Sequence, residues 1–176
     1  MRNLVILLCL LLVSVACNGS EKTSETKQRP SSESQTTTVY LVRHAEKGDG
    51  EDPDLTEAGR ARAERLREIL AAEPIVAVYT TAFNRTRQTA TPTADHHGVP
   101  VKTYDPGNLV RVAETIMNAH EGGAILVVGH SNTTPELAGI LSEGKSFAAI
   151  GEDDYANLLV VRVPVAGRPT VERRTY

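Results

Sequence analysis

Short apolar runs alternate with longer amphipathic segments over most of this chain. Apolar runs of strand length occupy residues 39–42, 75–79, 124–128 and 157–163, and we also expect short strands at 101–104 and 170–175. Runs rich in Val, Ile and Leu are typical of strands buried on both faces of a parallel sheet. The intervening segments favour helices at residues 84–94, 109–119 and 135–141, the first of them despite Pro92.

A further helix follows the first apolar run. Asp54 or Thr56 can cap it, and Pro74 ends it. Its expected inward face is Ala58, Ala61, Leu66, Ile69 and Leu70. Because strands and helices take turns, we expect one three-layer α/β domain, with a mostly parallel central sheet and helices on both faces, spanning residues 38–176. The segment at 170–175 is predicted to be an edge strand.

The first 37 residues do not fit this alternation. Residues 1–17 form a short basic start and an apolar run too short for a membrane span of about 20 residues, which is the pattern of a secretory signal. The run ends in Cys17 and resembles the lipobox of bacterial lipoproteins, although Ser14 departs from the commonest pattern. An ordinary cleaved signal and an uncleaved anchor are the alternatives. Residues 18–37 are polar, lack an apolar cluster and are predicted to be a disordered tether.

Composition narrows the chemistry of the predicted domain. Both cysteines, Cys9 and Cys17, lie in the signal segment, so the domain has neither a disulfide nor a cysteine nucleophile nor a cysteine-type zinc site. The net charge of −3 argues against a nucleic-acid partner. Oligomeric state is not encoded in any pattern that we recognise.

Polar residues of one kind follow three of the predicted strands. Arg43 and His44 follow the first, Arg85 comes shortly after the second, and His130 follows the run at 124–128. Each one alone is also explained as an ordinary polar residue at a strand end. Because the carboxyl ends of parallel strands meet at one edge of a sheet, where ligands of open α/β sheets bind, we expect the four to converge.

Two arginines and two histidines at one edge indicate phosphoryl transfer. Arginine binds phosphate oxygens with bidentate, charge-assisted hydrogen bonds. A neutral imidazole between such arginines can attack phosphorus and carry the phosphoryl group covalently. The cations in this site are side chains, so we expect neither a metal nor another cofactor. Asp95, His96 and His97 are adjacent in sequence, but no third metal ligand is evident beside them.

Four segments resemble the histidine phosphatase superfamily, whose fold is phosphoglycerate mutase-like. They begin at Leu41, Leu55, Thr81 and Val127, and they read LVRHAE, LTEAGRARA, TAFNRTRQTA and VVGHSN. They follow one another in the family's order and span most of the predicted domain. The resemblance implies that His44 is the nucleophile, that Arg43, Arg85 and His130 complete the phosphate pocket, and that a phosphohistidine forms transiently.

The sequence departs from the family in two respects. There is little room for the cap insertions of mutases and sugar bisphosphatases, so the domain is closest in size to the small phosphohistidine phosphatases. In addition, the general acid of the family has no clear counterpart in this sequence. Asp105 and Glu46 are equal candidates for it, and residues 152–154 form an acidic segment that is a third possibility.

We therefore expect an exported phosphatase, lipid-anchored at Cys17, that hydrolyses phosphomonoesters or phosphoramidates on small molecules or proteins. Its predicted location is the cell envelope, on the periplasmic or outer surface. Two alternatives remain: a phosphoglycerate-type mutase, and a phosphate-binding module that no longer turns over.

Overall fold

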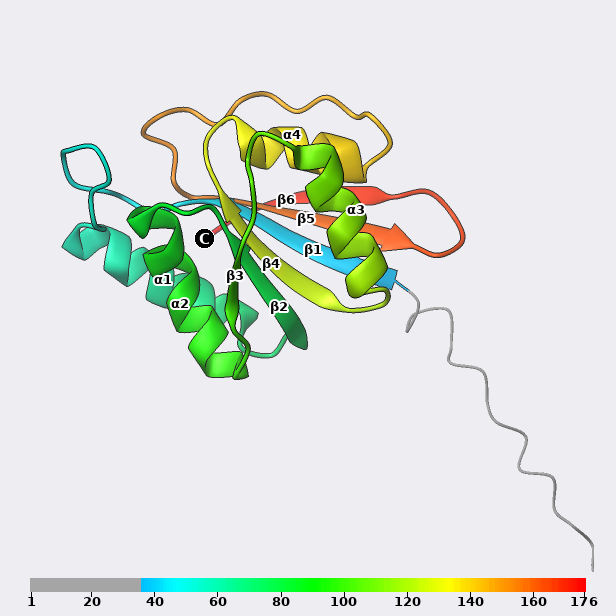
Figure 1. The fold of residues 1–176 in the computed structure, drawn as a ribbon, viewed down its shortest axis with the longest axis horizontal. Helices are drawn as coiled ribbons and strands as arrows, with labels where there is room; N and C mark the ends of the chain where they lie inside the picture. Colours follow the sequence, from blue (N-terminus) through cyan, green and yellow to red (C-terminus); the bar gives the residue numbers. More distant parts are fainter. Residues whose placement is uncertain (1–35) are drawn as a thin grey trace, which may run out of the picture.

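A computed structural model of the chain describes residues 36–176, which fold into the expected three-layer α/β domain (Figure 1). The predicted signal, Cys17 and nearly all of the tether lie outside the described residues. The strands are β1 (Thr36–Arg43), β2 (Ile75–Thr80), β3 (Val101–Thr103), β4 (Ala124–Gly129), β5 (Asn157–Pro164) and β6 (Thr170–Thr175). The helices are α1 (Glu57–Leu70), α2 (Asn84–His97), α3 (Leu109–Ala119) and α4 (Thr133–Leu141). No helix among the described residues is long and apolar enough to cross a membrane.

The six strands form one sheet in the order β3-β2-β4-β1-β5-β6. The first four strands of that order run parallel, and β5 and β6 are antiparallel to their neighbours. The predicted fold class is therefore confirmed, and β6 is an edge strand as expected. Strand β1 begins at Thr36, two residues before the expected start of the domain, because Thr36 and Thr37 pair with the end of β5.

Side chains of β1 alternate between two apolar layers, which explains the uninterrupted apolar run. Val39 and Leu41 pack with α3 and α4, whereas Tyr40 and Val42 pack with α1 and α2 on the opposite face. All four are at most 2% exposed. Figure 1 shows the two helix pairs on either side of the sheet. The strand is thus fixed from both sides, and so is the position at which it ends.

Helix α1 is rotated relative to our expectation. Its buried residues are Gly59, Ala63, Leu66 and Leu70, whereas Ala58, Ala61 and Ile69 are exposed. The true inward stripe contains a glycine, which an apolar pattern does not reveal. At Gly59 the helix touches the backbone that leaves β1: Thr56 caps the helix through the Gly59 N–H, and the Thr56 N–H donates to the Glu46 carbonyl at 2.9 Å. The helix therefore braces the segment just after His44.

Replacing Gly59 by alanine should destabilise the domain, although glycine inside a helix is ordinarily worse than alanine by roughly 0.5–1 kcal/mol. A Cβ at this position would lie 2.1 Å from the Glu46 carbonyl oxygen. We expect a loss of about 1–3 kcal/mol in the free energy of unfolding, measured with urea. Gly48→Ala is the control, because its Cβ would meet no atom closer than 3.8 Å. Equal stability of the Gly59→Ala variant and the unmodified chain would contradict this account of the contact.

Candidate active site

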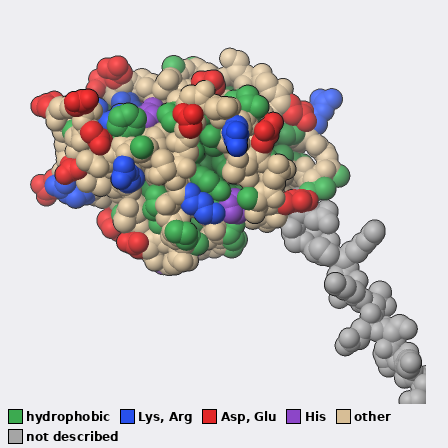
Figure 2. Space-filling model, viewed as in Figure 1, with side chains coloured by type: hydrophobic (Ala, Val, Ile, Leu, Met, Phe, Trp, Pro, Cys, Tyr) green, Lys and Arg blue, Asp and Glu red, His purple; other side chains and the backbone are tan. Residues whose placement is uncertain are grey.

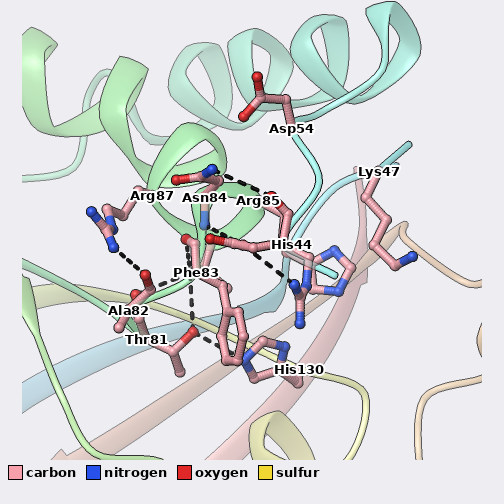
Figure 3. Close-up of polar contacts among 12 residues, drawn as sticks. His44, Lys47, Asp54, Thr81, Ala82, Phe83, Asn84, Arg85, Arg87 and His130 are labelled. Atoms are coloured by element: carbon pink, nitrogen blue, oxygen red, sulfur yellow. Dashed lines mark hydrogen bonds and ion pairs between the residues drawn. The ribbon is translucent and has the colours of Figure 1, made fainter. Parts of the chain in front are cut away.

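The carboxyl ends of β1, β2 and β4 bring four predicted residues to one edge of the sheet. Arg43 is the last residue of β1 and pairs with Gly129, so His44 and His130 leave adjacent strands side by side. Arg85 lies in the first turn of α2, which begins after the short turn that follows β2. The convergence expected from the parallel sheet is present, and Figure 3 shows the two imidazole rings with Arg85, Phe83 and Thr81 around them.

His44 is held by its backbone and by one ring nitrogen. Its N–H donates to the Gly129 carbonyl at 3.0 Å, and its Nδ1 lies 2.8 Å from the carbonyl oxygen of Ala45. A carbonyl only accepts, so Nδ1 must carry the proton, and Nε2 keeps its lone pair. No described residue hydrogen-bonds Nε2. His44 is 3% exposed and thus offers a fixed lone pair from a nearly buried ring.

His130 lies beside His44, with the ring centroids 5.6 Å apart. Its Nε2 is 2.9 Å from the Thr81 hydroxyl, which also contacts Thr86 at 3.0 Å. The backbone N–H of His130 donates to Thr133 at the start of α4. The ring is therefore oriented from two sides, by the turn after β2 and by the helix that follows β4.

Arg43 is buried, at 6% exposure, and is bound by the loop between α4 and β5. Its Nη1 donates to the carbonyls of Gly151, at 2.6 Å, and Glu152. The face of Tyr155 lies 4.4 Å from the guanidinium carbon. Within the described part of the chain Nε has no hydrogen-bond partner. Arg43 is thus anchored through one amino group while another donor remains available to a ligand.

Arg85 is the second guanidinium of the cluster. Its central carbon lies 4.3 Å from the ring centre of Phe83, and its Nη1 is 3.7 Å from a carboxylate oxygen of Asp52. That spacing is an ion pair without a hydrogen bond, and both Nε and Nη1 are buried without a hydrogen-bond partner among residues 36–176. Buried donors of this kind are normally satisfied, so their presence indicates a place for an anion.

The pKa of both histidines is lowered to about 4. Burial is the main cause for each ring, and the charges of Arg43 and Arg85 add to it. Both imidazoles are therefore neutral at pH 7. A neutral imidazole beside two fixed cations is a nucleophile held next to an anion-binding site.

Glu46 is turned toward α1. Both of its carboxylate oxygens accept from Arg62, at 2.7–2.9 Å, and Arg62 also donates to the carbonyl of Tyr176 at 3.0 Å. Burial is the largest single influence and acts to raise the pKa of Glu46, but the hydrogen bonds and charge of Arg62 and the backbone N–H of Glu46 together outweigh it, so the pKa lies below its ordinary value. An ionised carboxylate in an ion pair has no proton to give, so this geometry opposes the expected role of Glu46 as general acid.

Asp105 is exposed and accepts from the Gly107 N–H at 2.9 Å. It follows the edge strand β3 and lines a cavity of about 360 Å³ together with Tyr79, Asn108 and Arg111. Tyr104 lines the same cavity, and a Cβ on Gly129, directly before His130, would lie 2.7 Å from the Tyr104 hydroxyl. Among the described residues Asp105 makes no hydrogen bond or ion pair with the four residues of the cluster, and its carboxylate stabilises the turn after β3.

Comparison with known proteins now adds to this geometry. The family model of the histidine phosphatase superfamily (branch 1) matches residues 39–106. The fold matches the protein histidine phosphatase SixA, in a structure with tungstate, with a TM-score of 0.64 at 18% identity over 78% of this chain and 96% of that one. The resemblance to the histidine phosphatase superfamily is confirmed.

Two other solved structures illustrate how broadly this histidine phosphatase fold recurs. Bacillus stearothermophilus YhfR matches with a TM-score of 0.61 at 22% identity, over 77% of this chain and 95% of that one. A mycobacterial glucosyl-3-phosphoglycerate phosphatase matches with a TM-score of 0.64 at 12% identity, over 80% of this chain and 98% of that one. A search of curated proteins by sequence found no match. At these identities the neighbours establish the fold.

Sequence reasoning missed several residues that hold this site together. Thr89 is fully buried; its hydroxyl accepts from the Ala45 N–H at 2.9 Å and donates to the Arg85 carbonyl at 2.7 Å, which links the two halves of the cluster. A threonine at helical spacing from Arg85 gave no signal of this bridge. Tyr155 also gave no signal in the sequence, because only the long loop before β5 brings it to Arg43 and His44.

The histidines of α2 serve a different purpose. The Nε2 atoms of His97 and His96 lie 3.1 Å and 3.4 Å from the carbonyl oxygens of Leu70 and Ala71. These contacts join the end of α2 to the end of α1. Among residues 36–176 no group of three or more His, Cys, Asp or Glu side chains is placed to hold a metal ion.

Acid should destabilise the folded domain through the two site histidines. Their pKa values of about 4 lie below the ordinary 6.5, so between these values the unfolded chain binds more protons. The contribution to stability is complete above pH 6.5 and is lost as the pH falls toward 4. Urea unfolding at pH 7 and pH 5 measures the loss. His130→Gln cannot titrate and should show a smaller loss; the same loss in both proteins would contradict the lowered pKa.

Proposed function

We propose that this protein is a phosphatase that hydrolyses phosphomonoesters or phosphoramidates through a phosphohistidine on His44. The observation that carries the proposal is the unpartnered Nε2 of a neutral, nearly buried His44 beside two guanidinium groups with unsatisfied donors. The family match and the phosphatase names of several structural neighbours support the same reaction class.

In the first step Nε2 of His44 attacks phosphorus, and the bond between phosphorus and the leaving group breaks. Arg43 and Arg85 hold the non-bridging oxygens, whose charge is spread over three atoms in the transition state. The ring becomes an imidazolium once it carries the phosphoryl group. Its Nδ1–H already donates to the Ala45 carbonyl, so the new positive charge meets an acceptor that needs no rearrangement.

In the second step water attacks the phosphoryl group, phosphate leaves, and His44 returns to its neutral form. His130 is close enough to contact the same phosphoryl oxygens, and Thr81 fixes its ring. The sequence leaves little room for the cap insertions of mutases, which favours hydrolysis over transfer to a second substrate position.

The first step is short of a proton donor. Among the described residues Glu46 is ionised by Arg62, Asp105 makes no hydrogen bond to the cluster, the acidic segment 152–154 contacts it only through the Glu152 carbonyl, and both site histidines are neutral. The site therefore suits leaving groups that depart without help, such as a phosphoramidate already protonated on nitrogen, better than alkyl esters. This favours phosphoramidates, including phosphohistidine on proteins, among the proposed substrates. Because no proton donor is found among the described residues of the site, a turnover-deficient phosphate-binding module remains the second candidate function.

We also propose that the protein is exported and lipid-anchored at Cys17, in the cell envelope. This rests on the signal-like segment and the lipobox-like residues before Cys17. Cys17→Ala should leave an unprocessed or mislocalised precursor that carries no lipid. Wild-type protein that is soluble and cut at another position would exclude the anchor.

His44 should carry a phosphoryl group during turnover. A rapid quench at high pH preserves a phosphoramidate, so labelled substrate should leave its label on His44 of the full chain. His44→Ala should abolish both label and turnover, and EDTA should change neither. Label without steady release of phosphate would indicate the binding module instead, and full activity of His44→Ala would exclude the mechanism.

Arg85 has a matched control two residues away. Removing its charge-assisted hydrogen bonds, worth about 1.5–3 kcal/mol each, should lower the rate at least about tenfold in Arg85→Ala. Arg87 is on the same helix but donates to the Ala82 carbonyl, away from His44, so Arg87→Ala should stay within about twofold of wild type.

The dependence of the hydrolysis rate on the leaving group tests whether the site lacks a general acid. Phosphoramidates and activated aryl phosphates should be hydrolysed at least about a hundredfold faster than alkyl phosphates, because general acid catalysis typically contributes 10²–10⁴-fold. Glu46→Gln and Asp105→Asn should not change that ratio. A selective loss of alkyl phosphate hydrolysis in either variant would identify its carboxyl as the general acid after all.

A further inference from the structure

Two segments rich in carboxylates contact the phosphate-binding cluster, and each is preceded by one exposed lysine, Lys47 or Lys145. The first acidic loop comprises residues 48–56 and the second comprises residues 146–156, and neither contains Lys or Arg. Their carboxylates are Asp49, Glu51, Asp52 and Asp54 in the first loop, and Glu152, Asp153 and Asp154 in the second. Seven acidic groups around a cationic cluster are an unusual surrounding for a site that binds phosphate.

The first acidic loop touches Arg85. Asp52 lies 3.7 Å from its Nη1 and also accepts the Asn84 N–H at 2.9 Å, at the start of α2. The Asn84 side chain in turn donates to the Asp52 carbonyl at 3.3 Å. This loop is therefore fixed through Asp52 against the side of the cluster that Arg85 forms, whereas Asp54 accepts from Gln88 on α2 at 2.8 Å and lies farther from the two imidazoles (Figure 3).

The second acidic loop touches the other arginine. Arg43 donates to the carbonyls of Gly151 and Glu152, and the Ile150 N–H donates to the Ser131 carbonyl, directly after His130. Both loops are thus bound to the cluster itself. Figure 2 shows several acidic side chains gathered at the left end of the molecule, where Figure 1 places the loop between β1 and α1.

Most of these carboxylates are not neutralised within the described part of the chain. Asp52 pairs with Arg85 and Asp154 with Arg173, both at 3.7 Å. The remaining five, which form no ion pair with another residue of 36–176, are exposed: Asp49, Glu51, Asp54, Glu152 and Asp153. Lys47, at the start of the first loop, is exposed too and offsets only one of these charges.

We call the buried residues Arg43 and His44 the floor of the site and the exposed carboxylates of the two loops its rim. The floor is arranged to bind an anion. Arg43 and His44 are both more than nine-tenths buried, and each keeps a nitrogen without a hydrogen-bond partner among the described residues. A ligand that satisfies both the floor and the rim must present an anion inward and a cation outward. A second anionic group would instead meet the unpaired carboxylates of the rim.

We propose that the site selects phosphorylated compounds that bear an ammonium group close to the phosphate, as in a phosphorylated amino alcohol, and discriminates against polyanionic phosphates. The inference rests on the phosphatase function proposed above only in taking the cluster of His44, His130, Arg43 and Arg85 as the phosphate pocket. Water and salt screen each exposed charge beyond about 8 Å at physiological ionic strength, so the selection by charge depends on several carboxylates together.

Three phosphonates of matched length, which cannot be hydrolysed, test the proposal by binding alone. Aminoethyl-, hydroxyethyl- and carboxyethylphosphonate share the phosphonate and a two-carbon spacer, and their outer groups are cationic, neutral and anionic. Calorimetric titration of the full chain should give decreasing affinity in that order, with at least about a tenfold span, since clefts lined by one sign of charge discriminate by charge. Raising the salt concentration should shrink the span.

Two triple variants test whether the span of affinities depends on the rim carboxylates or on the net charge of the whole protein. Asp49→Asn/Glu51→Gln/Asp153→Asn removes three rim charges and should reduce the span at least about threefold, by raising the affinity for carboxyethylphosphonate. Asp95→Asn/Glu114→Gln/Glu121→Gln changes the net charge equally, at exposed positions on α2, on α3 and in the turn before β4. This control should keep the wild-type span.

The outcomes distinguish this inference from the phosphatase function. Equal affinities, the reverse order, an unchanged span in the rim variant or no measurable binding would overturn the charge selection, even if an aryl phosphate is hydrolysed through labelled His44. The expected order of affinities without any turnover would support the charge selection and exclude the phosphatase function.

Discussion

The burial of the Arg43 guanidinium is the constraint on which the rest of the site depends. A charge that leaves water costs several kcal/mol unless polar groups replace the solvent. Here the replacements are the carbonyls of Gly151 and Glu152 and the face of Tyr155, all from the loop before β5. That loop also binds the residue after His130, so one buried cation orders the wall of the site and the approach to both histidines.

The position of the site could be predicted from sequence because it depends on backbone topology. Parallel strands end at the same edge, and each of these strands has an apolar run that locates its end within a residue or two. Arg43, His44 and His130 follow those ends directly, and Arg85 follows by the first turn of a helix. Their convergence needed no knowledge of side-chain contacts, and the four motifs in family order supported the same arrangement.

The direction of side chains in loops could not be predicted in that way. Glu46 is two residues from His44, yet its carboxylate is drawn to Arg62, which the C-terminal Tyr176 helps to hold. Asp105 follows β3, the parallel edge strand beside β2, and its carboxylate accepts from the Gly107 N–H in the turn there. Tyr155 and Thr89 were missed for the same reason, since their partners come from distant parts of the chain. The inward face of α1 was misplaced because a glycine contact defines it.

These contacts bear on how the chemistry is understood. Glu46 and Asp105 both have other partners, so among residues 36–176 the cluster consists of cations and neutral bases, with no carboxylic acid hydrogen-bonded to it. The burial that lowers the pKa of His44 makes its lone pair available, and the same burial would oppose the imidazolium that forms after phosphoryl transfer. The Ala45 carbonyl relieves part of that cost by accepting from Nδ1. A leaving group that already carries its proton removes the remaining difficulty, and a positive charge on the departing part would meet a rim of carboxylates. Leaving-group chemistry and rim charge therefore favour the same kind of substrate, one that is anionic at phosphorus and cationic beside it.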